Sequence, residues 1–347
     1  MYFKKILVAI ALIGLIIVGY FAYYIYSAMF VPNTAFNNSE AFIYIKSDAT
    51  YNDVRADLEP LLKDIKTFDA LANQKKYTTN IKAGKYKIVK GMNNNDIINS
   101  IRSNNIPIKL SFNNQQSIEL LAGRIATQIE ADSISLLNSM TDEEFLTKNG
   151  FSSKTNLGMY LPNSYEFFWN TSADGFRDRM LKEYNRFWNE TRLNKAREIG
   201  LNPDKVMTLA SIVHEESKQR SEQPRIAGVY INRIKNKWPL QADPTLKFAA
   251  YQLPKFRNTV IKRVLNVHKE IDSPYNTYKN LGLPPGLIAM PDISAIEAVL
   301  NYEKHKYFYF AASADKPGYH KFAKTLSQHN QNARDYQRYL SKQGITK

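Results

Sequence analysis

The first 30 residues contain the feature that most constrains this chain, an uncharged run of 25 residues from Ile6 to Phe30. A helix needs about 20 apolar residues to cross the hydrocarbon core of a bilayer, so this run is long enough to span it. A cleaved signal peptide has a shorter apolar region of about 7 to 15 residues and a small-x-small exit, for which Tyr26-Ser-Ala28 is a poor match. The run therefore predicts an uncleaved, single-pass membrane anchor.

Charges on either side of this run predict its orientation. Lys4 and Lys5 precede it, whereas the first basic residue after it is Lys46. By the positive-inside rule the short amino end stays in the cytoplasm. We therefore expect a protein of the inner (cytoplasmic) membrane whose chain, from about Val31 onward, lies on the periplasmic or extracellular face.

The net charge of +15 bears on the choice of partner. In a cytoplasmic protein it would suggest nucleic acid, but the expected topology excludes that partner and leaves anionic envelope polymers or lipid head groups. Basic residues are scattered among acidic ones, so an ordinary solvated surface is the simpler explanation. The absence of cysteine means that the chain has no disulfide framework.

Residues 31–112 are expected to form a small α+β module. Phe42–Ile45 and Tyr86–Val89 have the pattern of strands, and Tyr51–Leu62 and Asn95–Arg102 carry helical periodicity. Two segments of this module share the order strand, polar turn and helix start. Such a pair favours a compact module resembling LysM, a fold that binds wall glycan, although a similarity over ten residues arises by chance nearly as often.

Residues 113–347 are expected to form a larger, mostly helical α+β domain with long loops. Pro107 and the polar run Asn113–Ser117 mark the connection into it. The expected elements are helical sequence over Ile118–Asn149 with caps at Asp132 and Asp142, a loop and strand over Leu157–Trp169, helices over Phe176–Ile199, Ile226–Ile234 and Asn332–Lys342, and a buried strand over Tyr307–Ala311. Loop-rich sequence over Leu240–Thr245, Ser273–Tyr278 and Gly282–Gly286 is typical of a binding surface.

One further helix carries the most informative carboxylate, Glu216. Asn202-Pro-Asp204 supplies a cap, a proline in the first turn and a favourable acidic residue for a helix start. At about 100° per residue, Glu216 falls at the edge of an apolar face, about 60° from its middle, while Glu215 points roughly the opposite way. Partial burial disfavours the charged carboxylate and raises its pKa, which is the state that a general acid needs.

Periodicity alone leaves the role of Glu216 open. Periodicity on its own favours a boundary residue that pairs with a nearby Lys or Arg, because structural ion pairs also perturb pKa values. His214-Glu215 superficially resembles the start of a zinc motif, but the second ligand of H-E-x-x-H would fall at Lys218. With no cysteine and only four other histidines, all downstream, the sequence predicts neither a metal site nor a cofactor.

Several segments in this order resemble the YceG-like (MltG) family of membrane-anchored endolytic peptidoglycan transglycosylases. The segments that carry the resemblance are Lys82–Tyr86, Leu157–Tyr165, Leu209–Glu216, Val229–Arg233, Leu240–Thr245, Ser273–Tyr278, Gly282–Gly286, His320–Phe322 and Ser327–Asn330. The chain departs from the family pattern at Leu157, where an acidic residue is typical, at Asn163-Ser164 in place of Asp-Thr, and at His214, where an acid is common.

The resemblance implies a reaction and a set of site residues. The reaction is cleavage of the bond between N-acetylmuramic acid and N-acetylglucosamine in nascent strands, which leaves 1,6-anhydromuramoyl ends and terminates glycan elongation. The implied catalytic residue is Glu216. The implied substrate-binding residues are Asp243, Asn276, Thr277, Tyr278, Tyr165 and His320. Implied partners are peptidoglycan strands, the membrane through residues 6–30, and peptidoglycan synthases of the penicillin-binding protein class.

The sequence leaves alternatives open at several of these positions. Asp243 is either a turn residue before proline or a glycan ligand, and as a second carboxylate it could make the protein a hydrolytic muramidase. Turn chemistry alone would explain Asn276, and His320 and His329 are either polar groups of a cleft or ordinary surface residues. A different class of function is a non-catalytic scaffold that binds peptidoglycan.

Overall fold

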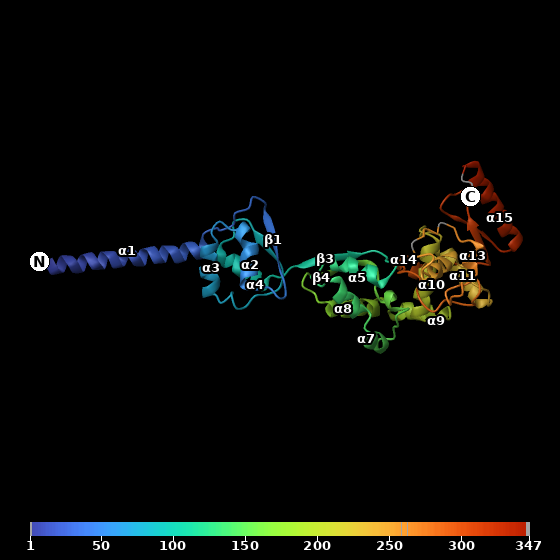
Figure 1. Cartoon of the computed structure of the whole chain (residues 1–347), viewed down its shortest axis with the longest axis horizontal. Helices are drawn as coiled ribbons and strands as arrows, with labels where there is room; N and C mark the ends of the chain where they lie inside the picture. Colours follow the sequence, from blue (N-terminus) through green and yellow to red (C-terminus); the bar gives the residue numbers. More distant parts are fainter. Residues whose placement is uncertain (1, 258, 262, 345–347) are drawn as a thin grey trace. The chain divides into compact units, whose positions relative to one another are not determined.

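The computed structural model shows a mixed α+β protein that is mostly helical, with an apolar helix at its amino end, as the sequence predicts. It describes residues 2–257, 259–261 and 263–344. The chain forms two compact units. Unit 1 comprises the chain up to Leu110 together with segments 128–131 and 165–172, and unit 2 comprises the remainder. Figure 1 shows the order of their elements.

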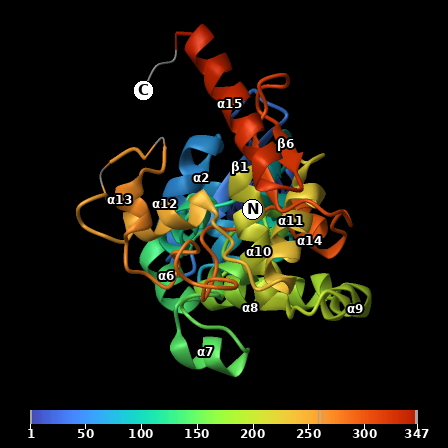
Figure 2. The same ribbon diagram turned by 90° about the vertical axis from the view of Figure 1, so that its right-hand side faces the viewer.

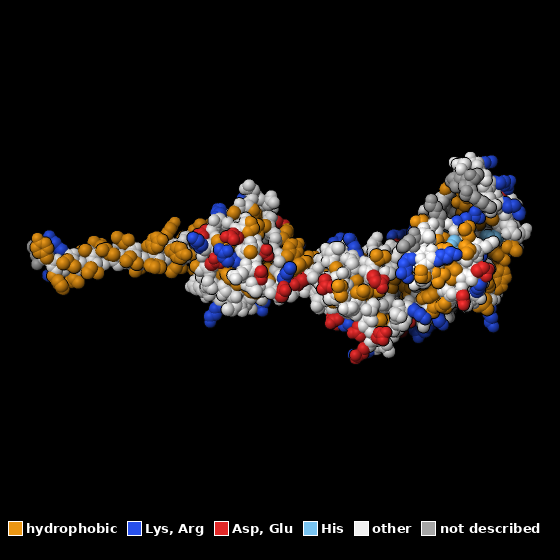
Figure 3. All heavy atoms as spheres, viewed as in Figure 1, with side chains coloured by type: hydrophobic (Ala, Val, Ile, Leu, Met, Phe, Trp, Pro, Cys, Tyr) orange, Lys and Arg blue, Asp and Glu red, His pale blue; other side chains and the backbone are white. Residues whose placement is uncertain are grey.

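Helix α1 (Tyr2–Phe30) contains the uncharged run. Its side chains are exposed along nearly its whole length, and Figure 3 shows them as an almost continuous apolar surface. By length and composition it can cross a membrane. Near its end Ala28 is buried in unit 1, where its carbonyl accepts a 2.8 Å hydrogen bond from Asn94 Nδ2.

Strands β1 (Glu40–Ile45) and β2 (Gly84–Val89) form the two-stranded antiparallel sheet of unit 1, with Glu40 opposite Val89 and Ile45 opposite Gly84. Because side chains alternate along a strand, Ile43 and Ile45 share the core face with Tyr86 and Ile88. Both strands were expected, and each begins two residues earlier than the sequence suggested.

Four helical segments cover this sheet: α2 (Tyr51–Leu58), the 3-10 turn η1 (Glu59–Leu61), α3 (Ile65–Gln74) and α4 (Asn94–Ser103). Thr50 and Asp53 cap the start of α2 reciprocally, and Asn93 caps α4. Helix α3 was not anticipated. Its N-cap is Asp64, whose carboxylate accepts hydrogen bonds from the next backbone N–H groups.

Strands β3 (Pro107–Phe112) and β4 (Asn163–Phe168) form a second two-stranded sheet. The sequence suggested that Pro107 begins a connection, and this was wrong, because residues 107–112 are a strand with Leu110 and Phe112 buried. Proline is tolerated there because it occupies the first position of the strand, where its missing N–H matters least.

Unit 2 is built mainly from helices. They are α5 (Ile118–Ala126), α6 (Ser133–Met140), α7 (Glu143–Lys148), η2 (Asn156–Met159), α8 (Ala173–Phe187), α9 (Glu190–Glu198), α10 (Pro203–Glu216), α11 (Gln223–Lys235), α12 (Asp243–Tyr251), α13 (Asn266–Lys269), α14 (Ile293–Leu300) and α15 (Leu326–Lys342). Strands β5 (Tyr309–Ala312) and β6 (His320–Ala323) pair antiparallel beside α15.

Capping explains where the helices of unit 2 follow the sequence and where they differ from it. Asp132 and Asp142 cap α6 and α7 as predicted. The single long helix expected over 176–199 is two helices, because the Asn189 side chain caps a new start by accepting from Arg192 N–H. Helix α15 begins earlier than expected because Thr325 caps it.

Two further expectations for the second half of the chain were wrong. Asp243 opens a nine-residue helix in place of a loop, and Pro244 is compatible with this because it lies in the first turn. Strand β5 is half-buried along its length, whereas the sequence suggested a fully buried strand.

Helix α10 is the centre of the core of unit 2. Every residue from Val206 to His214 is buried, because α11, α12 and α14 contact it on several sides. Figure 2 shows these four helices gathered together. The last turn of α10 emerges from this core, and Glu216 is its final residue.

Candidate active site

The start of α10 is fixed as the sequence predicts, and this determines where its other end lies. Asn202 Oδ1 accepts a 3.0 Å hydrogen bond from Lys205 N–H, Pro203 occupies the first turn and Asp204 follows it. With the helix buried over nine residues, its carboxyl end cannot move without disturbing the core. Glu216 is therefore held on a rigid element.

Glu216 is half-buried and is hydrogen-bonded by Tyr230 of α11. The Tyr230 hydroxyl donates to Glu216 Oε1 at 2.5 Å. Burial raises the pKa of Glu216 from 4.5 to about 7, and the negative charge of Asp243 adds to the rise, while the Tyr230 hydrogen bond and the positive charges of Arg233 and Lys247 oppose it. Near neutral pH the carboxyl group can therefore either donate or accept a proton.

Tyr230 was not identified as a site residue from the sequence. Its ring is fully buried and meets the edge of Phe310 with centroids 5.9 Å apart. Burial raises the pKa of its hydroxyl well above the usual value, so the group remains a donor. The only sequence signal was its place inside the motif Val229–Arg233, which says nothing about a contact with a residue 14 positions earlier.

Asp243 and Tyr278 form a second hydrogen-bonded pair in the same neighbourhood. The Tyr278 hydroxyl donates to Asp243 Oδ1 at 2.6 Å, and Asp243 is exposed in the first turn of α12. Burial, followed by Asp243 itself, raises the pKa of Tyr278, and Glu216 contributes to the same rise. The structure thus brings Glu216, Asp243 and Tyr278 within electrostatic reach of one another.

Asn276 and Thr277 precede Tyr278 in the chain, and their side chains hydrogen-bond to the backbone around this pair. The buried Asn276 amide donates to the carbonyls of Lys269 and Ile271, both at 2.8 Å, and its oxygen accepts from Tyr278 N–H. Thr277 Oγ1 accepts from Ala242 N–H at 3.0 Å. Their polar groups therefore hold the backbone near Asp243, and a role in sugar binding stays a prediction.

Arg233 is a buried cation that the sequence analysis did not single out. Its guanidinium donates from Nε to the carbonyl of Phe308 at 2.8 Å and from a terminal nitrogen to the carbonyl of Leu240. Because its hydrogen bonds go to backbone carbonyls, its charge stays available to act on nearby groups. It opposes the rise in pKa of both Glu216 and Tyr278.

A buried carboxylate, Glu222, ties the end of α10 to strand β6. Its Oε1 accepts from Ser217 Oγ at 2.6 Å and lies 2.8 Å from His320 Nδ1, while its Oε2 accepts from His320 N–H at 3.0 Å. His320 also meets the edge of Phe310, the ring that contacts Tyr230. His320 therefore belongs to the support around Glu216.

Three other residues of the sequence analysis contact residues outside this cluster. Tyr165 belongs to unit 1, on β4, with its ring near that of Phe167. His329 stacks on Tyr309 with centroids 5.3 Å apart, and burial lowers its pKa. Burial also lowers the pKa of His214, which contacts Asn114 and Lys218 through Nε2.

The donor groups present bear on metal binding. Among the described residues, no three His, Asp or Glu side chains are grouped so that they could hold a metal ion. The polar groups of the site are instead two carboxylates, two phenols and two cations. Such a set suits proton transfer and hydrogen bonding to a neutral, hydroxyl-rich ligand.

Comparison with known proteins gives this geometry a context. The model of the YceG-like family matches residues 43–335. An endolytic murein transglycosylase of Bacillus subtilis (strain 168) is 32% identical over 278 residues, which are 75% of this chain and 74% of that protein. One of Streptococcus pneumoniae (strain R6) is 25% identical over 352 residues, which are 92% of this chain and 62%, less than two thirds, of the relative.

A solved structure is similar over most of the chain. The crystal structure of a YceG-like protein from Listeria monocytogenes, at 27% identity, superposes with a TM-score of 0.56 and covers 85% of this chain and 99% of that one. The family match extends over most of the sequence and includes α10, α11 and α12 with the residues around Glu216. This chain belongs to the YceG-like family.

Proposed function

We propose that this protein is an endolytic murein transglycosylase, a lyase that cuts the glycan strands of peptidoglycan. The bond is the β-1,4 link between N-acetylmuramic acid and N-acetylglucosamine, and the product is a 1,6-anhydromuramoyl end that terminates a growing strand. Family membership and the names of the relatives support the activity. The single observation that carries it is Glu216, a carboxyl group held by Tyr230 with a pKa near 7.

The reaction needs one group that first gives and then takes a proton. Protonated Glu216 donates its proton to the glycosidic oxygen as the bond to C1 of the muramoyl residue breaks. The resulting carboxylate then accepts the proton of the C6 hydroxyl while that oxygen forms the new bond to C1. No water is consumed and the carboxyl group ends protonated, ready for another cycle. A pKa near 7 suits both halves of this exchange.

Asp243 and Tyr278 would bind the strand rather than attack it. Their hydrogen bond places one carboxylate and one phenol at an exposed position beside Glu216, where both can contact sugar hydroxyl and N-acetyl groups. The charge of Asp243 also helps to keep Glu216 protonated. The second candidate function, a hydrolytic muramidase, would instead use Asp243 to form a covalent intermediate or to activate water.

The rest of the chain would bring this site to its substrate. We propose that α1 anchors the protein in the cytoplasmic membrane with its amino end in the cytoplasm. The part of unit 1 after α1 would act as a LysM-like module that binds glycan, and peptidoglycan synthases would be the partners. We place the functional boundaries at residues 1–30, 31–112 and 113–347. The support is the apolar surface of α1 and the strand and helix pattern of unit 1.

Product chemistry tests the proposal. The full-length protein in detergent, and its Glu216→Gln variant, are incubated with uncrosslinked peptidoglycan strands, and the ends formed are identified by mass spectrometry. We expect anhydromuramoyl ends from the parent and none from the variant. Reducing ends would favour the muramidase, and Asp243→Asn would then abolish them. No cleavage by either protein, with binding retained, would favour a non-catalytic scaffold.

A further inference from the structure

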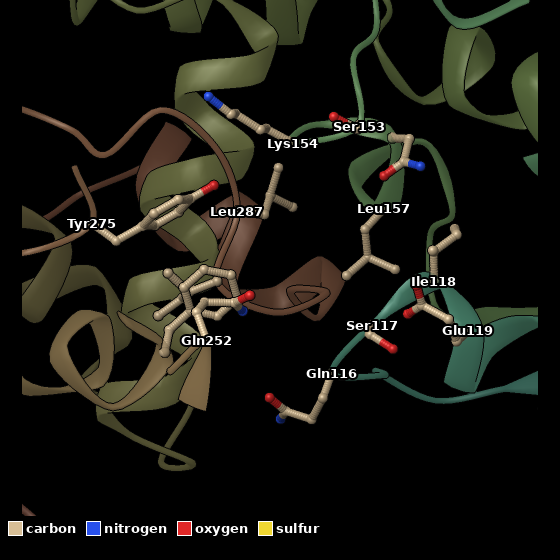
Figure 4. A pocket seen from close by; sticks show the side chains of 13 residues that line it. Gln116, Ser117, Ile118, Glu119, Ser153, Lys154, Leu157, Gln252, Tyr275 and Leu287 are labelled. Atoms are coloured by element: carbon tan, nitrogen blue, oxygen red, sulfur yellow. The ribbon is translucent and has the colours of Figure 1, made fainter. Parts of the chain in front are cut away.

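Unit 2 contains a cavity of about 420 Å³ that the proposed mechanism does not use. Its floor is aliphatic, formed by Leu157, Leu287 and Ile288, and its walls carry amide and hydroxyl groups. Figure 4 shows Leu157 and Leu287 in the middle of the cavity, with Gln116 and Gln252 at one edge. Neither Glu216 nor Asp243 lines it.

The cavity is nevertheless built from the same elements as the site around Glu216. Helix α12 carries Asp243 at its start and contributes Phe248 to the cavity five residues later, which is about 7 Å along a helix axis. The loop that presents Tyr278 to Asp243 presents Tyr275 to the cavity. The cavity therefore shares α12 and the loop of Tyr278 with the site around Glu216.

A second connection runs through α10. Gln116 lines the cavity, and its Nε2 donates to Glu215 Oε1 at 3.5 Å, a contact with the residue immediately before Glu216. The cavity therefore reaches the last turn of α10 through the contact of Gln116 with Glu215, in addition to the helix α12 that it shares with the site around Glu216.

The charges of the cavity restrict its occupant. Lys154 and Glu119 are exposed at opposite sides of it, with the aliphatic floor between them (Figure 4). Within the described part of the chain, neither side chain takes part in a salt bridge. A ligand that fits would combine small apolar groups with a carboxylate for Lys154 and an ammonium group for Glu119.

We propose that this cavity binds the peptide stem carried by the muramoyl residue of the strand, an inference that rests on the proposed function. A stem peptide has alanine methyl groups that suit an aliphatic floor, free carboxylates, and an amine on its diamino acid. The sugars of the strand are neutral and would leave Lys154 and Glu119 unused. The cavity would therefore make cleavage depend on the peptide as well as on the glycan.

The test compares two substrates that differ in the peptide and in the lactyl carboxylate that its removal exposes. The full-length protein in detergent cuts uncrosslinked strands that carry stems and the same strands after an amidase has removed them, and kcat/KM is measured for both. We expect the parent to favour the stem-bearing strands by about tenfold, the size of one charge-assisted interaction. Lys154→Gln should remove most of this preference by lowering only the stem-bearing rate.

Two further variants check whether the effect of Lys154→Gln comes from the cavity. Ser153→Trp places bulk at another exposed residue lining the cavity and should reduce the same preference. Lys205→Gln, an exposed lysine of unit 2 that lines a different pocket, should change neither rate.

The outcomes separate the two proposals. Equal cleavage of both substrates by the parent, or an equal loss on both in Lys154→Gln, would overturn the assignment of the peptide stem while leaving the transglycosylase in place. Failure of the parent to cut either substrate would overturn the proposed function, and this inference with it.

Discussion

The cores of the two units differ in what they bury. Unit 1 is organised around fourteen buried residues, all apolar or tyrosine, and in its described part no charged side chain is buried. Unit 2 buries Arg177, Glu222 and Arg233 together with two histidines. Burying a charge is costly unless it is paired or hydrogen-bonded, so its presence needs a compensating reason.

The partners of Glu222 connect it to the neighbourhood of Glu216. Around Glu216 they form a connected set that runs from Tyr230 through Phe310 and His320 to Glu222. The described part of unit 1 therefore buries no charged side chain, whereas unit 2 buries charged groups in the network around Glu216. The following predictions test this contrast.

The largest effect is expected from Glu216→Gln. Removing the proton-transfer group should lower the rate of strand cleavage about a thousandfold, within the range for general acid–base catalysis. Glu215→Gln is the matched control, because Glu215 contacts Gln116 and Lys218 instead of Tyr230, and it should retain most of the rate. Comparable losses in both variants would contradict the assignment.

The same variant should become more stable than the parent at high pH. Because the pKa of Glu216 is raised from 4.5 to about 7, its contribution to folding is fully present below pH 4.5 and is lost as the pH rises through 7. Glutamine does not ionise. In thermal unfolding, Glu216→Gln should therefore gain in Tm over the parent as the pH rises from 5 to 8.

In unit 1 we expect a core substitution to lower the stability of the unit and to leave the catalytic pH profile unaffected. Phe68 is fully buried, so Phe68→Ala should lower the free energy of unfolding of unit 1 by about 3 to 5 kcal/mol. Hydrogen exchange of the β1 and β2 amides measures this directly. Phe42→Ala, at an exposed position on β1, is the control and should cost far less. The pH dependence of cleavage should be unchanged in both.

A smaller effect is expected at Glu222, which acts through its neighbours. Glu222→Gln keeps one acceptor oxygen but puts an NH2 group where Oε2 accepts from His320 N–H, so Glu216 should be held less firmly. We expect kcat to fall about tenfold, as for loss of one hydrogen bond to a charged group, with KM nearly unchanged. Glu303→Gln, which disturbs an exposed pair with Arg225, is the control. A lower Tm with unchanged kcat would make Glu222 merely structural.

The smallest effect is a shift in the pH profile. Because the Tyr230 hydrogen bond lowers the pKa of Glu216, Tyr230→Phe should move the alkaline limb of kcat/KM to higher pH. Asp243 raises that pKa, so Asp243→Asn should move the limb to lower pH. Shifts in the same direction would show that the limb does not report Glu216.

Much of this architecture could be predicted from local sequence, because local chemistry determines it. The strands of unit 1 follow from alternation, and the starts of α6, α7 and α10 follow from Asp132, Asp142 and Asn202. The start of α12 could not be predicted in this way, because a proline suits a turn and the first turn of a helix equally well. The break before α9 was missed because a single capping side chain, that of Asn189, determines where the new helix starts.

The site itself was only partly predictable. The apolar face of α10 pointed to Glu216, and family resemblance added Asp243 and Tyr278. Tyr230 and Glu222 were missed because their importance lies in contacts made only after folding, across 14 residues in one case and 98 in the other. For Asn276 the sequence left a ligand role and a turn role open, and its burial and its hydrogen bonds to backbone carbonyls could be seen only in three dimensions.

The end of α1 has a mechanical consequence for a protein at a bilayer. Ala28 is buried and bonded to Asn94, and Met29 contacts the core of unit 1, so the helix enters the folded unit without an intervening flexible linker. A tether of disordered residues would let a domain explore a range of heights above the lipid. With α1 in a bilayer, as proposed, the height and tilt of unit 1 would follow those of the helix, and bilayer thickness would change the distance between unit 1 and the lipid.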